Sequence, residues 1–289
     1  MRSKGRTEKW LSRCMLGILF LLAALVLSPL VFLAAGSFMG QQELNEWLAP
    51  VLEESSTLYV KWKMLPRYPT LWSYVKLLLD SPSFFVMFWN SVKLTFGVLA
   101  GHLLVAVPAA WAFARYRFPG KKALFTLYIA LMMMPFQVLM LSNYLVLDQL
   151  HLLDRLSGII LPGIFSTFPV FLMYRFFESV PETLLDAARL DGAGEVQIFV
   201  RLGLPLGSPG IISAMVLGFL EYWNLIEQPM AFLKEKSLWP VSLFLPNITL
   251  EEAGLAFATS VVALLPALLV FLAGQDYLEQ GIMASATKE

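Results

Sequence analysis

The chain has 289 residues, of which 58% are hydrophobic and only 15% are charged, and its mean hydropathy is +0.68. Soluble domains are usually about 45–50% apolar and about 25% charged, so this composition excludes an ordinary soluble protein and predicts a polytopic membrane protein. The formal net charge is zero, which gives no electrostatic indication of nucleic-acid binding. Cys14 is the single cysteine, so an internal disulfide and a thiolate metal cluster are both excluded.

A basic N-terminal stretch, residues 1–13, precedes the first long apolar run at residues 14–35. A signal peptide also begins with basic residues, but its apolar region has only about 7–15 residues, whereas a spanning helix needs about 20. We therefore expect residues 14–35 to be a retained first transmembrane helix, with residues 1–13 in the cytoplasm.

Residues 36–83 are more polar and mix tryptophans with acidic residues and prolines. We expect an extracytoplasmic segment with short interfacial helices, in which Trp47, Trp62 and Trp72 anchor at the headgroups. A docking role for these tryptophans is the alternative.

Five further apolar runs predict membrane spans at about residues 84–114, 123–147, 156–177, 208–228 and 253–274. They form a predicted five-helix core at residues 84–275, followed by a cytoplasmic tail at 276–289. Pro135 is expected to kink the third span, because proline lacks a backbone donor.

The distribution of Lys and Arg predicts the topology of these spans. Four cations crowd the short loop Ala114–Lys122, and the predicted inner segments hold thirteen of the 21 Lys and Arg residues against seven in the outer ones. Since basic residues favour the cytoplasmic side, we expect both termini to be cytoplasmic.

A mostly polar stretch, Ser179–Pro205, separates the fourth and fifth spans and is predicted to be cytoplasmic. Ser179 and Glu182 have the spacing of a capping box, and good helix formers follow. Gly192 is expected to break this helix and reverse the chain with φ > 0. A second helical pattern, Glu195–Leu202, completes a helix–glycine–helix shape that a protein partner can bind.

The same stretch carries an acidic residue followed by two alanines, then Asp-Gly-Ala, Ile and Leu-Pro. These residues are Asp186, Ala187, Ala188, Asp191, Gly192, Ala193, Ile198, Leu204 and Pro205. The pattern resembles the EAA loop of the permease subunits of binding-protein-dependent ABC importers, with Asp186 where that family usually has glutamate. Four other stretches look like the second permease of maltose-transporter-type sugar importers: Asn90-Ser91, Ala112–Lys122, Met132–Val138 and Arg175–Glu182.

The resemblance implies an all-α polytopic membrane protein with six transmembrane helices, the type I ABC importer permease fold and a cytoplasmic coupling helix. It implies that the loop residues above dock on a cytoplasmic ATPase, and that the complex lies in a bacterial-type plasma (inner) membrane. The implied partners are a second homologous permease, two ATPase subunits and an extracytoplasmic solute-binding protein. The chain lacks the motif G-x-x-x-x-G-K-[ST], so we expect a non-catalytic subunit without a cofactor, with ATP and Mg bound by the partner ATPases.

Polar side chains inside spans are costly and usually face a protein interior or an aqueous path. Glu221, Asn224 and Gln228 stand at i, i+3 and i+7, which predicts one stripe on the fifth span. With Gln137 and Trp223 they form a candidate substrate pathway, because amide, carboxylate and aromatic groups suit hydroxyl-rich sugars. Alternatively, they hydrogen-bond to neighbouring helices or to the partner permease.

These observations predict a permease subunit of an ATP-driven importer for a sugar, oligosaccharide or related polyol, which couples ATPase closure to alternating access. An ion-gradient-driven secondary transporter is one alternative, although the chain shows no evident internal repeat. A non-transporting membrane scaffold that recruits an ATPase is the other. The sequence does not name the solute.

Overall fold

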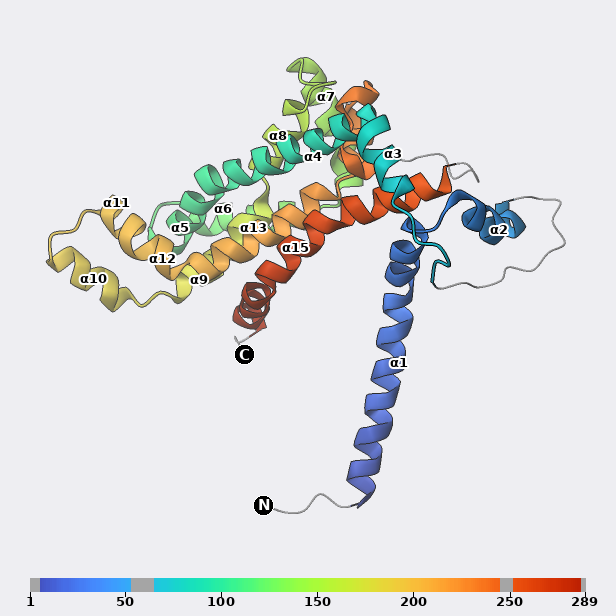
Figure 1. Cartoon of the computed structure of the whole chain (residues 1–289). Helices are drawn as coiled ribbons and strands as arrows, with labels where there is room; N and C mark the ends of the chain where they lie inside the picture. The colour runs from blue at the N-terminus through green and yellow to red at the C-terminus, as the bar shows by residue number, and fades with distance from the viewer. Residues whose placement is uncertain (1–5, 53–64, 245–251, 287–289) are drawn as a thin grey trace. The chain divides into compact units, whose positions relative to one another are not determined.

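The computed structural model describes residues 6–52, 65–244 and 252–286, and the regular elements in these residues are all helical (Figure 1). Residues 1–5, 53–64, 245–251 and 287–289, which include Trp62 and parts of the predicted N-terminal segment and tail, lie outside the described residues. The chain divides into two compact units. Unit 1 comprises residues 1–82 and 245–264, and unit 2 comprises residues 83–244 and 265–289.

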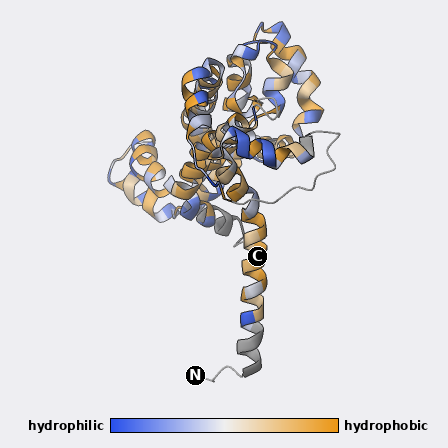
Figure 2. Cartoon of the chain, turned by 45° about the vertical axis from the view of Figure 1, so that its right-hand side comes forward, coloured by the Kyte–Doolittle hydropathy of each residue, from blue (hydrophilic) through white to orange (hydrophobic). Residues whose placement is uncertain are grey.

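Unit 1 contains α1 (Arg6–Ser37), α2 (Gln41–Leu52), α3 (Trp72–Asp80) and the first part of α15 (Ala253–Ala286). Most apolar side chains of α1 between Met15 and Val31 are exposed, which suits a helix surrounded by lipid. Figure 2 shows that hydrophobic residues make up most of this helix. Trp47 is only 2% exposed and packs between the rings of Phe32 and Phe257. The expectation of a headgroup anchor is therefore wrong for Trp47, which belongs to the core of unit 1.

Unit 2 begins with one long apolar helix, Pro82–Arg115, built from α4 (Pro82–Gly101), a π-helical stretch (His102–Ala106) and α5 (Val107–Arg115). The helices that follow are α6 (Lys121–Met132), α7 (Phe136–Gln149), α8 (Ser157–Ile164), α9 (Thr167–Ser179), α10 (Glu182–Leu190), α11 (Glu195–Ile198), a second π-helical stretch (Phe199–Gly203), α12 (Leu204–Leu206), α13 (Ser208–Trp223) and α14 (Glu227–Phe232). Two short 3-10 turns, Lys236–Leu238 and Val241–Leu243, precede α15.

Four helices in the described residues are long and apolar enough to cross a membrane: Ser12–Ser37, Pro82–Arg115, Ser157–Ser179 and Ala253–Glu279. Two further pairs are sharply bent. Lys121–Met132 and Phe136–Gln149 meet at 104°, and Glu195–Leu206 and Ser208–Trp223 meet at 68°. The described part of the chain therefore has four candidate spans, or six if each bent pair is one span.

Several predicted boundaries need correction. The third span is broken rather than kinked, because Pro135 has an extended backbone (ψ 144°) between α6 and α7. The fifth span ends at Trp223 instead of residue 228. Directly after Trp223, the Asn224 side chain donates a hydrogen bond to Leu220 O at 2.8 Å, and this bond competes with the backbone hydrogen bond that would continue the helix. Helix α15 continues to Ala286, so the predicted tail is helical over its described residues.

The predicted capping box is also wrong. Ser179 is the last residue of α9, and its hydroxyl donates to Phe176 O at 2.7 Å rather than to the start of the next helix. Helix α10 begins at Glu182, directly after Pro181, whose extended backbone (ψ 132°) turns the chain. The local turn thus depends on proline instead of a serine cap.

Close helix packing in unit 2 depends on small residues. A Cβ added at Gly101 would lie 2.2 Å from Cγ1 of Ile164, so α4 and α8 approach each other through this glycine. An alanine there overpacks the contact.

We expect Gly101→Ala to lower the free energy of unfolding by about 1–3 kcal/mol, the usual cost of overpacking a core. Equilibrium unfolding in mixed micelles measures the change. Gly194→Ala is the matched control, because a Cβ at Gly194 meets nothing within 4 Å and its φ is −73°. Equal stability of the two variants would contradict the close approach.

Candidate functional site

Helix α10 is anchored to the core of unit 2 mainly by one fully buried side chain, Leu185. Leu185 is fully buried and belongs to the same core cluster as Trp111, Phe177 and Ile198, which come from α5, α9 and α11. Figure 1 shows α10 and α11 at one end of unit 2, joined by a short turn. The predicted cytoplasmic loop is therefore packed against the helices that it connects.

Arg115, the last residue of α5, ties three helices together. One of its terminal nitrogens donates to the carbonyl oxygens of Phe177 and Val180, and the other lies 3.1 Å from Glu182 Oε2. The guanidinium also lies 5.7 Å from the ring centroid of Trp111, and the side chain is only 8% exposed. Because the last carbonyls of a helix have no partner within it, Arg115 closes the end of α9 while holding the start of α10.

Arg189 connects the two halves of the loop. It lies 2.9 Å from Glu195, 2.8 Å from Asp186 and 3.3 Å from Glu182. These hydrogen bonds, that to Glu195 foremost, raise the pKa of Arg189, so the side chain stays charged at any physiological pH. Asp186, one of the loop residues implied to dock on an ATPase, is thus already paired within the chain.

The turn at Gly192 has the predicted conformation. Its φ is +83°, and its amide donates to Arg189 O at 3.0 Å, while the Ala193 amide donates to Ala188 O at 3.0 Å. These bonds satisfy the last carbonyls of α10 and direct the chain into α11. The expectation of φ > 0 is confirmed.

Some residues of the EAA-like motif face the core of unit 2, and others face outward. Ala188, Ala193 and Leu204 pack against the core cluster. Asp186, Ala187, Asp191, Gly192 and Pro205 are exposed. The outer side of α10, opposite Leu185, also presents Leu184 and Leu190, which are 48% and 89% exposed. We name this surface, comprising Leu184, Ala187, Leu190 and Asp191, the outer face of α10.

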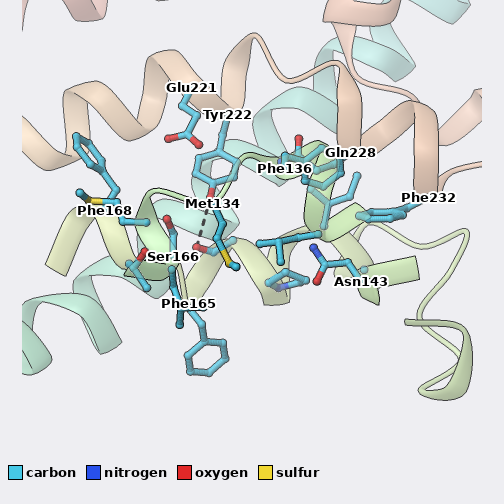
Figure 3. A pocket seen from close by; sticks show the side chains of 18 residues that line it. Met134, Phe136, Asn143, Phe165, Ser166, Phe168, Glu221, Tyr222, Gln228 and Phe232 are labelled. Atoms are coloured by element: carbon cyan, nitrogen blue, oxygen red, sulfur yellow. Dashed lines mark hydrogen bonds between the residues drawn. The ribbon is translucent and has the colours of Figure 1, made fainter. Parts of the chain in front are cut away.

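A cavity of about 440 Å³ lies elsewhere in unit 2 and is lined by 18 residues (Figure 3). Three interruptions of helices border it. Met134 and Phe136 come from the α6–α7 break, Phe165 and Ser166 come from the α8–α9 break, and Gln228 follows the break after α13. Glu221 and Tyr222 reach it from the last turn of α13.

One backbone carbonyl in the cavity wall is held from several sides. Gly163 O lies 2.9 Å from His102 Nε2 and accepts the Ser166 amide at 3.0 Å. The Tyr222 hydroxyl lies 3.5 Å from the same oxygen. This carbonyl lies near the end of α8, so the π-helical stretch that follows α4, the residue before α9, and α13 all contact the break that lines the cavity.

The structure brings only part of the predicted pathway together. Glu221 and Gln228 both line the cavity, but they stand on different helices and not on one stripe, because α13 ends between them. Gln137 instead donates to Glu227 Oε1 at 2.6 Å. Trp223 is buried against Phe219 and Phe88, and Asn224 caps α13, so neither lines the cavity.

Sequence reasoning missed three polar residues of the cavity lining, Asn143, Ser166 and Thr167. Asn143 carried the same signal that singled out Gln137, since both are amides within a predicted span. Ser166 and Thr167 were not singled out, although Gly163 and Pro169 on either side of them are residues at which a membrane helix can bend.

Residues 95–284 match a protein-family model described as the binding-protein-dependent transport system inner membrane component. The chain belongs to this family. It is therefore a multi-pass inner-membrane permease, the non-catalytic membrane subunit of an ABC importer. Such a permease works with an ATPase and a solute-binding protein.

Known permeases of this kind match over most of the chain. The arabinooligosaccharides transport system permease protein AraQ of Bacillus subtilis is 30% identical over 226 residues, which cover 77% of this chain and 80% of that protein. The sn-glycerol-3-phosphate transport system permease protein UgpE of Yersinia pestis is 27% identical over 250 residues, covering 83% and 89%.

A solved structure has the same fold as this permease. A crystal structure of a bacterial ABC transporter involved in the import of the acidic polysaccharide alginate contains a chain that aligns with a TM-score of 0.78. The two chains are 21% identical, and the alignment covers 96% of this chain and 99% of that chain. The all-helical ABC importer permease fold predicted from the sequence is confirmed.

Replacing Arg115 tests the tie between α5, α9 and α10. We expect Arg115→Ala to lower the free energy of unfolding by about 1.5–3 kcal/mol, because carbonyls at the end of α9 lose a charged donor. Hydrogen exchange of the amides in residues 182–198 should become faster.

Arg117→Ala is the matched control, since Arg117 is exposed and has no hydrogen-bond or ion-pair partner in the part of the chain that the structure describes. Its effect on stability should stay within about 0.5 kcal/mol. Unchanged exchange in the Arg115 variant would show that Leu185 alone holds α10.

Proposed function

We propose that this permease forms one half of the transmembrane pathway of an importer for a sugar, oligosaccharide or related polyol, and that α10 couples the pathway to an ATPase. The observation that carries the coupling role is the outer face of α10, whose exposed apolar side chains lie on a helix held in place by Arg115 and Leu185. An exposed apolar surface on a fixed helix suits a protein partner. The relative named for arabinooligosaccharides supports the solute class.

The proposed complex contains a second homologous permease, two ATPase subunits and an extracytoplasmic solute-binding protein. The proposed topology places both termini and the loop at residues 179–205 in the cytoplasm, and residues 36–83 outside. Residues 14–35 form the first span, and residues 84–275 contain the transport core. The distribution of Lys and Arg supports this orientation.

The coupling works through α9 as a rigid element. ATPase closure displaces α10, and Arg115 and Leu185 transmit that displacement to the ends of α5 and α9. Helix α9 has 13 residues and is about 20 Å long, at about 1.5 Å per residue. Its other end adjoins Ser166 and Gly163 in the cavity wall. Because α9 is one continuous helix, a displacement of α10 reaches the cavity wall through a rigid element.

A charge on the outer face tests the docking role. We expect Leu190→Glu to weaken association with the ATPase subunits at least about tenfold, because in the proposed complex the ATPase would cover an unpaired carboxylate in place of an apolar side chain. Co-purification of the ATPases with tagged permease, together with solute uptake, measures the effect. Leu190→Met is the matched control and should retain both, whereas full association of the Leu190→Glu transporter would refute docking by this face.

Cysteine labelling tests the proposed orientation. In a Cys14→Ser permease expressed without the ATPase subunits, Leu190→Cys should react with a membrane-impermeant maleimide in inside-out vesicles but not in intact spheroplasts. Tyr68→Cys, at an exposed position of the proposed outer segment, should show the reverse pattern. Labelling of both positions from one side would overturn the topology.

A further inference from the structure

We infer that the cavity of unit 2 is a charge filter, which admits neutral or cationic hydroxylated solutes and excludes anionic ones. This inference rests on the proposed function, since it takes the cavity to be part of the solute path. It names a property of the solute that neither the family nor the relatives assign to this chain.

The backbone around the cavity indicates that it holds water. Helices that cross a bilayer are interrupted only where the freed backbone groups are buried in protein or line an aqueous space. Here the breaks at Met134, at Phe165–Ser166 and after Trp223 all border the same cavity. Convergence of three interruptions on one space is the arrangement expected of a solute path.

The charge of the cavity has one sign. Among the residues that line it, Glu221 carries the only ionisable carboxylate, and no lysine or arginine is present. A second acid, Glu227, adjoins the lining residue Gln228 and accepts a hydrogen bond from Gln137 at 2.6 Å. No basic side chain of the lining offsets these acids.

The electrostatic repulsion between Glu221 and an anionic solute is large enough to select against that solute. For two like unit charges about 6 Å apart at an effective dielectric constant of about 20, the Coulomb energy disfavours occupancy on the order of a hundredfold. An anionic phosphate or uronate meets this barrier beside Glu221, whereas a neutral sugar does not.

The hydrogen-bonding groups favour a solute that donates. The Glu221 carboxylate accepts hydrogen bonds, and Gln228 Oε1 is buried with no partner in the described part of the chain. Asn143 and Ser166 can both donate and accept, and Figure 3 shows Ser166 and Glu221 on facing sides of the cavity near Tyr222. Sugar hydroxyls or an ammonium group satisfy these acceptors, and Phe136 and Phe232 offer rings to the apolar face of a sugar.

The inference separates this chain from two proteins that it resembles. Glycerol-3-phosphate and alginate are anionic, whereas arabinooligosaccharides are neutral, and all three appear in the names of the matching transport proteins. The charge filter excludes the two anionic solutes and is compatible with the neutral one.

A charge-selective labelling experiment tests the filter without knowledge of the natural solute. The full transporter, with Cys14→Ser and Ser166→Cys in this chain, is treated with a cationic and an anionic methanethiosulfonate reagent, each rate being divided by its rate with free mercaptoethanol. Mass spectrometry of the peptide that contains residue 166 gives the extent of reaction. We expect the normalised rate to be at least about tenfold higher for the cation.

Removing the carboxylate should remove the preference. Glu221→Gln should lower the ratio of the two rates at least about fivefold, and Glu235→Gln, an exposed acid outside the cavity, should leave it unchanged. If Glu221→Gln is not recovered from membranes, Gln228→Glu adds a charge and should raise the ratio.

Equal normalised rates would overturn the inference. So would the absence of reaction with either reagent in the resting, ATP-bound and vanadate-trapped transporter, while Tyr68→Cys, at an exposed position outside the cavity lining, reacts normally. Failure of the proposed function would give a different result. The permease would then purify without ATPase subunits or would not support uptake, but the ratio of the two labelling rates could still be measured.

Discussion

The contact on which both functional regions depend is that of Arg115 with the end of α9. A helix end buried against protein leaves carbonyl oxygens without partners, and a single guanidinium supplies donors to Phe177 and Val180 while pairing with Glu182. The same group lies over Trp111 in the core. Helix α10 is therefore an extension of the packed helices and not a solvated loop, which is the mechanical condition for transmitting a push from a partner.

The two functional regions are connected by one helix. Helix α9 ends at the Arg115 contact and begins beside Ser166, in the wall of the cavity. The carbonyl of Gly163 at that break is contacted by His102 and Tyr222 from two other helices. In the proposed coupling, a displacement at the loop changes a wall that several helices share, and interrupted helices can follow such a change more easily than continuous ones.

The residues of the EAA-like motif stand together in the sequence, but the structure places them in different environments. Ala188, Ala193 and Leu204 pack inward, whereas Ala187, Asp191 and Pro205 are exposed. Asp186 pairs with Arg189 inside the chain. No spacing rule could divide them, because the division depends on where the core cluster around Leu185 and Trp111 lies. Trp47 was misassigned for the same reason, since its partner Phe257 is distant in sequence.

The sequence by itself determined the membrane class, the helical fold, the position of the loop and the positive φ at Gly192. These features follow from hydropathy and from backbone preferences that act within a few residues. Only the tertiary structure decided that α13 ends before Gln228, that Glu221 and Gln228 nevertheless meet in one cavity, and that Ser166 joins them. The physical reason is that a cavity lining depends on which segments far apart in the chain pack side by side, and local propensity does not determine that packing.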